Sequence, residues 1–201
     1  MKHLLRLLFW IAIWNPKSKN LKVRKMTEFN IFTEGLKAFP SDEQTIWKLD
    51  EKDIIIKTRK MLEHYIKILG RKSCLKGYKY KSITLDIVFC DSEKTHELNR
   101  EYRDKDKPAD IITFAIFADD ENRFVFDDDI NLGEIVIALD KVIEGVNRDI
   151  SHSANKEQEL YFLISHGLMH LLGFDHRDEE EYNFVISEQR KALECIDYVK
   201  I

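Results

Sequence analysis

The sequence predicts a single compact domain of the α+β class, in which a small sheet is packed by helices. Segments with strand-like spacing alternate with segments of helical spacing, and the C-terminal part is rich in helix. Apolar residues make up 44% of the 201 residues, whereas glycine and proline number only seven and three. This composition indicates a packed core rather than a disordered chain. An α/β layer fold is the alternative that the alternation leaves open.

The first half of the chain predicts a helix, a strand and a second helix in that order. Residues 51–69 carry apolar side chains at the spacing of one helix face. Residues 82–90 alternate in polarity and are rich in β-branched side chains, which predicts a strand. A helix over residues 92–103 is expected to turn Leu98 and Tyr102 toward the core.

The second half adds two strands and three helices. Strands are predicted over residues 110–118 and 132–139, and the acidic stretch 119–131 between them is expected to be a loop or hairpin. A further strand is expected near residues 27–33. The three helices are expected over residues 140–149, 156–172 and 178–198.

Residues 1–25 differ in charge from the rest of the chain. They hold seven basic residues and no acidic one, so the net charge of −4 leaves −11 on the remaining residues. The chain begins like a signal peptide, but no small-residue cleavage site follows, and Met26 offers an alternative start. We therefore interpret residues 1–25 as an upstream extension or a disordered tail, and residues 26–201 as the functional domain. The alternative is an amphipathic anchor at a membrane surface.

The charge and the cysteines narrow the possible functions. The net negative charge of residues 26–201 argues against non-specific binding of duplex nucleic acid, which needs a strong positive field. Cys74, Cys90 and Cys195 are an odd number of cysteines without close spacing, so we expect ordinary thiols in a reducing compartment. These features favour a cytoplasmic protein without stable membrane association.

Three histidines stand at the spacing of a metal site. His166 and His170 are four residues apart, which places both imidazoles on one face of a helix. Gly173 can adopt a positive φ and end that helix, so that His176 folds back toward the other two. Three neutral imidazoles leave one tetrahedral position open, as a catalytic zinc requires. The flanking residues are apolar almost all round, which predicts a buried helix.

The same run matches the zinc-protease pattern except at one position. Gly167 stands where a protease carries the glutamate that acts as general base. A peptidase therefore lacks its central residue here. Asp175, next to His176, is placed either to orient a ligand imidazole or to cap a turn.

Three segments of the chain carry a family resemblance. They are HGLMHLLGFDH at 166–176, LNREYRDKDKPADIITF at 98–114 and GEIVI at 133–137. In this order they resemble the signature segments of the YbeY family of metal-dependent, single-strand-specific endoribonucleases. None of the departures replaces a histidine of the run. The departures are Met169, Ala109, Thr113, Ala115 and Glu134.

The resemblance implies a fold, a cofactor and a substrate. It implies a mixed sheet of about four strands and a metal-binding helix similar to that of zinc proteases. His166, His170 and His176 would hold one Zn²⁺ per chain, with Arg103 as the functional arginine near the metal. It further implies 3′-end maturation of 16S rRNA and quality control of the 70S ribosome. The partners would be single-stranded RNA, ribosomal subunits and assembly factors.

These residue types fit cleavage of a phosphodiester. A zinc ion lowers the pKa of its bound water, and an arginine neutralises the charge that develops on phosphate. We expect Arg103 to take this role, although it is also placed to pair with Asp104 or Asp106 at the surface. Weaker candidates near the site are Asn99, Arg100, Lys105, Lys107 and Thr113.

A basic stretch over residues 67–81 contains no acidic residue and includes Tyr78 and Tyr80. Such a stretch suits the backbone and bases of single-stranded RNA, and Lys76 and Lys79 are its candidate phosphate contacts. The alternative is a solvated loop between a helix and a strand.

Two other functions remain open. One is a non-catalytic ribosome-assembly factor whose zinc is structural, in which loss of a histidine would unfold the protein. The other is a zinc peptidase or another zinc metallohydrolase, against which the missing glutamate argues.

Overall fold

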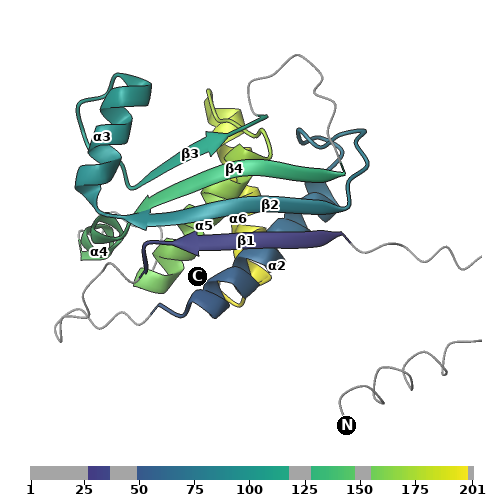
Figure 1. Cartoon of the computed structure of the whole chain (residues 1–201), viewed down its shortest axis with the longest axis horizontal. Coiled ribbons are helices and arrows are strands. Elements are labelled where there is room, and N and C mark those ends of the chain that lie inside the picture. Colours follow the sequence, from purple (N-terminus) through teal and green to yellow (C-terminus); the bar gives the residue numbers. More distant parts are fainter. Residues whose placement is uncertain (1–26, 37–48, 118–127, 148–154, 199–201) are drawn as a thin grey trace, which may run out of the picture.

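A four-stranded mixed sheet forms the centre of the protein, with strand order β1-β2-β4-β3 (Figure 1). The structure is a computed structural model that describes residues 27–36, 49–117, 128–147 and 155–198. Strands β1, β2 and β4 run parallel, and β3 pairs antiparallel with β4 at the edge. The predicted α+β fold with a small mixed sheet is therefore confirmed. The strands are β1 (Glu28–Glu34), β2 (Ser82–Cys90), β3 (Ile111–Ala115) and β4 (Asp129–Ala138).

Five helices are described. Helices α2 and α5 pack against one face of the sheet, and α6 packs on these two helices (Figure 1). Helix α5 contacts β3 and β4 as well as α2, α4 and α6, so it is the central helix of the layer. Among the helices of the described ranges, none is both long and apolar enough to cross a membrane. The helices are α2 (Glu51–Leu69), α3 (Ser92–Arg103), α4 (Leu139–Asn147), α5 (Lys156–Leu171) and α6 (Glu179–Glu194).

Strand β4 begins earlier in the sequence than predicted. Strand β4 begins at Asp129, inside the stretch 119–131 that was expected to be a loop or hairpin. Ile130 explains the difference, because its side chain is buried in the core in spite of the acidic residues before it. Residues 119–127 of that stretch, like residues 1–25, lie outside the described residues.

Helix α3 faces inward with polar side chains, so the expectation that Tyr102 points into the core is wrong. The Tyr102 side chain is 61% exposed and its ring lies edge-on to Phe114 at 5.3 Å. The buried residues of the helix are Thr95 and Asn99. The Asn99 amide donates to the Lys107 carbonyl at 2.7 Å, and the Thr95 hydroxyl accepts from the backbone of the following loop. Hydrogen bonds rather than apolar contacts therefore set the orientation of α3.

Two small residues on either side of His166 seat α5 in the core. The Ser165 hydroxyl lies 2.6 Å from the Tyr65 hydroxyl of α2, and both residues are fully buried. Gly167 lies against β4, where a Cβ atom would approach the Ile135 side chain at 2.8 Å. No room exists there for the glutamate of a zinc protease, so α5 of this chain cannot present a general base from that position.

We expect Gly167→Ala to destabilise the protein. Three atoms of a β-branched side chain would have to move, and such overpacking costs about 1–3 kcal/mol, against roughly 1 kcal/mol gained from helix propensity. The predicted net loss is up to about 2 kcal/mol in the free energy of unfolding, measured with urea. The matched control is Ile135→Val, which removes one of the contacting atoms and should reduce the cost of Gly167→Ala. A gain of stability in both backgrounds would contradict the packing described here.

Candidate metal centre

The end of α5 folds so that a loop histidine returns to the helix. Leu172 caps the helix through bonds to the last carbonyls, and Gly173 then adopts a φ of +87°, which the absence of a side chain permits. The Phe174 amide donates back to the Met169 carbonyl at 3.0 Å. This tight turn brings His176 beside the two helix histidines, as the spacing in the sequence predicted.

The three imidazoles converge through their Nε2 atoms. His166 Nε2 lies 3.0 Å from His170 Nε2 and 3.4 Å from His176 Nε2. A tetrahedral ion with metal–nitrogen bonds of about 2.0–2.1 Å keeps two ligand atoms about 3.3–3.4 Å apart, so the spacing fits a transition-metal ion. Among the described residues, these three are the only His, Cys, Asp and Glu side chains gathered closely enough to hold a metal together. Within that part of the chain, no such fourth group closes the site.

Burial keeps the helix histidines in the form that binds metal. Desolvation, followed by the neighbouring His170 and His176, lowers the pKa of His166 to about 4. Desolvation also lowers the pKa of His170, and the charges of His176 and Arg103 act in the same direction. Both rings are therefore neutral near pH 7, with a lone pair available to an ion.

Asp175 serves the turn that carries His176. Its Oδ1 atom accepts from the His176 amide at 2.8 Å, and its Oδ2 atom lies 3.3 Å from Nε of Arg177. These bonds lower the pKa of Asp175, the backbone bond contributing most. The same carboxylate lies 4.0 Å from Nδ1 of His170, beyond hydrogen-bond distance. The turn-capping role is thus present in the structure, and orientation of a ligand imidazole by Asp175 stays a prediction.

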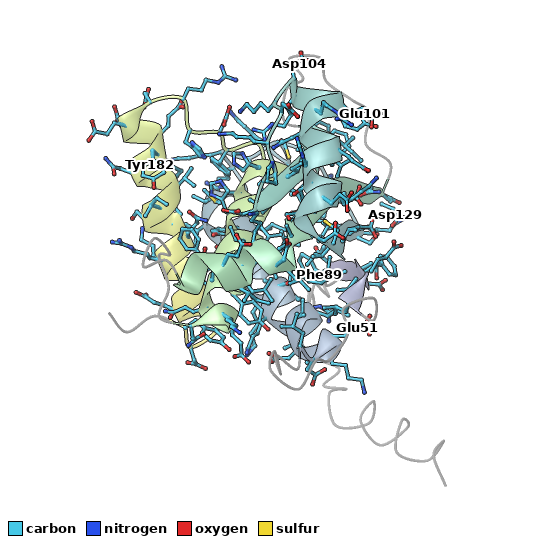
Figure 2. The ribbon with its side chains drawn as sticks, turned by 90° about the vertical axis from the view of Figure 1, so that its left-hand side faces the viewer. Glu51, Phe89, Glu101, Asp104, Asp129 and Tyr182 are labelled. Atoms are coloured by element: carbon cyan, nitrogen blue, oxygen red, sulfur yellow. The ribbon has the colours of Figure 1, made fainter. Side chains whose placement is uncertain are left out.

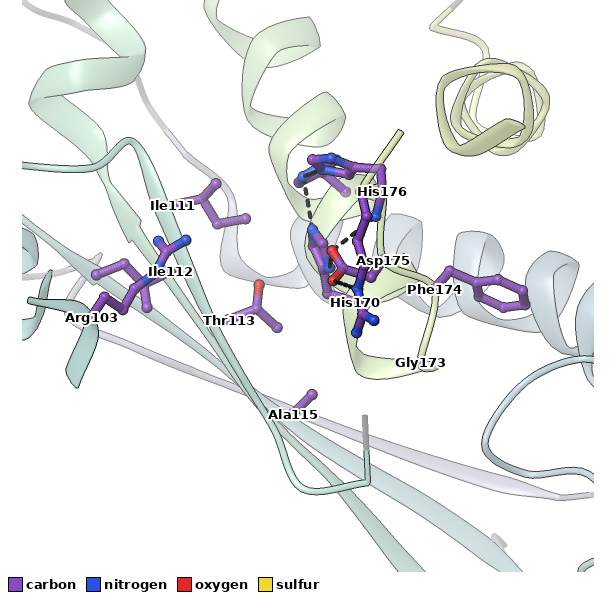
Figure 3. A pocket seen from close by; sticks show the side chains of 12 residues that line it. Arg103, Ile111, Ile112, Thr113, Ala115, His170, Gly173, Phe174, Asp175 and His176 are labelled. Atoms are coloured by element: carbon purple, nitrogen blue, oxygen red, sulfur yellow. Dashed lines mark hydrogen bonds and ion pairs between the residues drawn. The ribbon is translucent and has the colours of Figure 1, made fainter. Parts of the chain in front are cut away.

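A cavity of about 470 Å³ opens between the histidine loop and strand β3. Figure 3 shows Thr113 and Arg103 across this space from His170 and His176. Apolar side chains of β3 form its floor, and arginines lie at its edges. The lining residues are Arg103, Ile111, Ile112, Thr113, Ala115, His166, His170, Gly173, Phe174, Asp175, His176 and Arg177.

Arg103 lies at the end of α3 and is available to a ligand in the cavity. Its Nη1 atom donates to Asn99 Oδ1 at 3.4 Å, a long bond that orients the side chain. The next residue, Asp104, caps the helix in the left-handed conformation (Figure 2). Asp106 pairs with His96 at 2.7 Å, and the described structure contains no ion pair of Arg103 with either aspartate. The surface-pair alternative for Arg103 therefore has no support in this structure.

The structure does not bring the other predicted RNA contacts into the cavity. Arg100, Lys105 and Lys107 are exposed on α3 and the loop that follows it, close in sequence to Arg103. Lys76 and Lys79 are exposed in the segment after α2. That segment meets the metal loop through its own backbone, because the Cys74 amide donates to the Leu172 carbonyl at 2.9 Å. RNA contact by these five basic residues stays a prediction.

Three residues of the site were missed or underrated from the sequence. Asn99 is buried, and it holds both Arg103 and the loop after α3. Arg177 lines the cavity, and its position directly after His176 was the only signal in the sequence. Tyr182, on α6 (Figure 2), lies edge-on to His176 with ring centroids 5.6 Å apart. A tyrosine in the first turns of a helix carries no local signal for such a contact.

The fold and the site together define a candidate metallohydrolase: an α+β domain whose central helix presents three histidines to an open cavity. Residues 45–197 match the family model described as Endoribonuclease YbeY, and the chain belongs to this family. The resemblance noted in the sequence is therefore confirmed. Membership supports the role of an RNA-cleaving hydrolase for this chain.

Three bacterial relatives, each named Endoribonuclease YbeY, illustrate the similarity. The Fusobacterium nucleatum protein is 34% identical over 140 residues, which cover 69% of this chain and 82% of the relative. The Heliobacterium modesticaldum protein is 34% identical over 157 residues, covering 74% and 93%. The Oceanobacillus iheyensis protein is 36% identical over 143 residues, covering 68% and 90%.

The low pKa of His166 predicts an acid-sensitive stability for the metal-free protein. The pKa is about 4 in the folded state and 6.5 in the reference state, so the unfolded chain binds more protons between these values. Stability is therefore lost as the pH falls from 6.5 toward 4, and His166 accounts for up to about 3 kcal/mol of the loss. Urea unfolding in the presence of a chelator at pH 7, 5.5 and 4.5 measures this dependence.

The comparison for that experiment is His166→Asn. This variant lacks the titrating ring, so its stability should fall less steeply over the same pH range. Parallel pH profiles of the variant and the wild type would show that the buried ring does not carry the effect.

Proposed function

We propose that this chain is a zinc-dependent endoribonuclease specific for single strands, which acts in 3′-end maturation of 16S rRNA and in quality control of the 70S ribosome. The observation that supports it best is the convergence of three Nε2 atoms at the spacing of a tetrahedral ion, beside a cavity that Arg103 also lines. Ribosomal RNA, ribosomal subunits, assembly factors and a cytoplasmic location follow from the resemblance to the YbeY family.

Different residues of the site would bind the metal ion and the phosphate. His166, His170 and His176 would hold one Zn²⁺, which when bound supplies a Lewis acid that activates water near neutral pH. Arg103 would bind the scissile phosphate, because its planar guanidinium stays charged and pairs with phosphate oxygens. Asn99 restricts the rotation of that guanidinium through its Oδ1 atom. Ile111 and Ile112 of β3 line the same cavity, so part of the wall beside the arginine is apolar.

The charge distribution supports a single strand over a duplex. Residues 26–201 carry a net negative charge, so a nucleic acid would be attracted only to local basic surfaces. These are Arg103 with Arg100, Lys105 and Lys107, and the segment 67–81. A flexible single strand can place one phosphate in the cavity, while its other phosphates contact the basic residues outside it.

Cleavage of RNA tests the proposal directly. Purified protein should contain about one zinc per chain by mass spectrometry and should cut a labelled single strand faster than the same strand annealed to its complement. A chelator should abolish cleavage and added zinc should restore it. Arg103→Ala should lower the rate by about 10²–10³-fold, because one group that stabilises the transition state is removed. His170→Ala should lose both zinc and activity.

The control is Arg190→Ala, since Arg190 is an exposed arginine on α6 that does not line the cavity. It should cut at the wild-type rate. Retention of full cleavage by Arg103→Ala would contradict the proposed role of the arginine. If the zinc-loaded wild type binds RNA without cutting it, and His170→Ala unfolds, the non-catalytic alternative with structural zinc is favoured.

The basic segment after α2 is tested by the salt dependence of binding. Each phosphate contact on a single strand adds about 0.7 to the slope of log affinity against log salt concentration. The double variant Lys76→Ala/Lys79→Ala should therefore lower the slope by about 1.4 if both side chains contact phosphate. The control pair is Lys52→Ala/Lys60→Ala, two exposed lysines of α2. Equal slopes for the two double variants would identify the segment as an ordinary solvated loop.

A further inference from the structure

Gln189 of α6 is a buried polar residue that the proposed mechanism does not use. Its side chain is fully inaccessible, and its amide nitrogen donates to the Phe162 carbonyl of α5 at 3.3 Å. The amide oxygen, Oε1, is also buried and has no partner that meets hydrogen-bond geometry among the described residues. An unpaired buried amide oxygen is costly, so its position requires an explanation.

The complementary unpaired atom lies on His166. Its Nδ1 atom is likewise buried without a partner in the described residues, while its Nε2 atom faces the other two histidines. Phe162 precedes His166 by one turn on α5, and helical side chains lean back toward the preceding turn. The Gln189 amide is held at the Phe162 carbonyl, which is the level at which the His166 ring lies.

The bond to Phe162 sets the orientation of the Gln189 amide. A flipped amide would set its oxygen against the Phe162 carbonyl oxygen, so the nitrogen faces Phe162 and the oxygen is the atom left for another partner. The Gln189 side chain lies within hydrogen-bonding reach of His166.

We propose that Gln189 is the positioning residue of the metal centre: its Oε1 atom accepts from Nδ1–H of His166 and thereby leaves the Nε2 lone pair for the metal ion. The alternative tautomer would place a nitrogen lone pair against the amide oxygen and point a proton into the site. A neutral amide suits this buried place better than a carboxylate, since it also donates to Phe162 and carries no charge to desolvate. The inference rests on the metal site of the proposed function, but not on cleavage of RNA.

Two measurements that do not involve RNA test this role. Long-range ¹H–¹⁵N NMR of the metal-free protein should show His166 as the Nδ1–H tautomer in the wild type. In Gln189→Met, which keeps the length but removes the acceptor, this preference should be lost. Zinc affinity, measured by competition with a chelator, should fall by about 10–100-fold in Gln189→Met, as is typical when the partner of a ligand imidazole is removed.

The matched control is Gln158→Met. Gln158 is also buried and also donates its amide to a backbone carbonyl, that of Tyr198 at 2.7 Å, but it does not line the cavity. This variant should lose stability while keeping the tautomer of His166 and the zinc affinity. Gln189→Asn provides a second test, because the shorter side chain withdraws the oxygen and should have the same effect as Gln189→Met.

Wild-type tautomer and zinc affinity in Gln189→Met or Gln189→Asn would overturn the proposal. So would a loss of zinc affinity in Gln158→Met as large as that in Gln189→Met, because it would show that buried packing and not the acceptor matters. This outcome is separate from that of the proposed function. If the protein binds zinc with His166 oriented by Gln189 but leaves RNA intact, the proposed nuclease activity is refuted and the role of Gln189 is not.

Discussion

The close seating of α5 on the sheet is the constraint on which the site depends. Ser165 is tied to Tyr65 of α2, and Gly167 lies directly against Ile135 of β4, so the residue between them has little freedom to rotate. The helix rotation that satisfies these two contacts turns His166 and His170 toward β3 and the cavity. A side chain at position 167 would push α5 away from β4 and displace the histidines. The same contacts desolvate the imidazoles, which keeps them neutral.

The side of the cavity opposite the histidines consists of strand β3 and of Arg103, which helix α3 holds in place. This helix docks through Thr95 and Asn99, and its left-handed cap at Asp104 turns the chain toward β3. Because Asn99 contacts both the following loop and Arg103, the position of the guanidinium is coupled to the fold of the loop. A positive charge is thereby held near His170, where its field disfavours protonation of that ring. The arginine thus supports the neutral, metal-binding form of His170.

The features that the sequence predicted correctly depend on contacts between residues close together in the chain, and those it missed depend mainly on contacts formed in the folded protein. The histidine trio lies within eleven residues, and local helix and turn geometry brings it together, so spacing alone predicted it. Tyr102 was misplaced because periodicity assumes an apolar inner face, whereas α3 docks through polar groups. The start of β4 was missed because acidic residues precede the buried Ile130. Gln189 meets α5 only in the folded state, so no spacing along the chain reveals its contact.

In the described part of the chain, the lining of the cavity suits phosphate chemistry better than peptide chemistry. A metallopeptidase needs a general base beside the metal, and the position that would supply it is filled by Gly167 against Ile135. Asp175, the one carboxylate among the described residues that line the cavity, is engaged by the His176 amide and by Arg177. A phosphodiester carries its own negative charge, and its cleavage depends on cations placed around it. Arg103 and Arg177, which both line the cavity, meet that requirement.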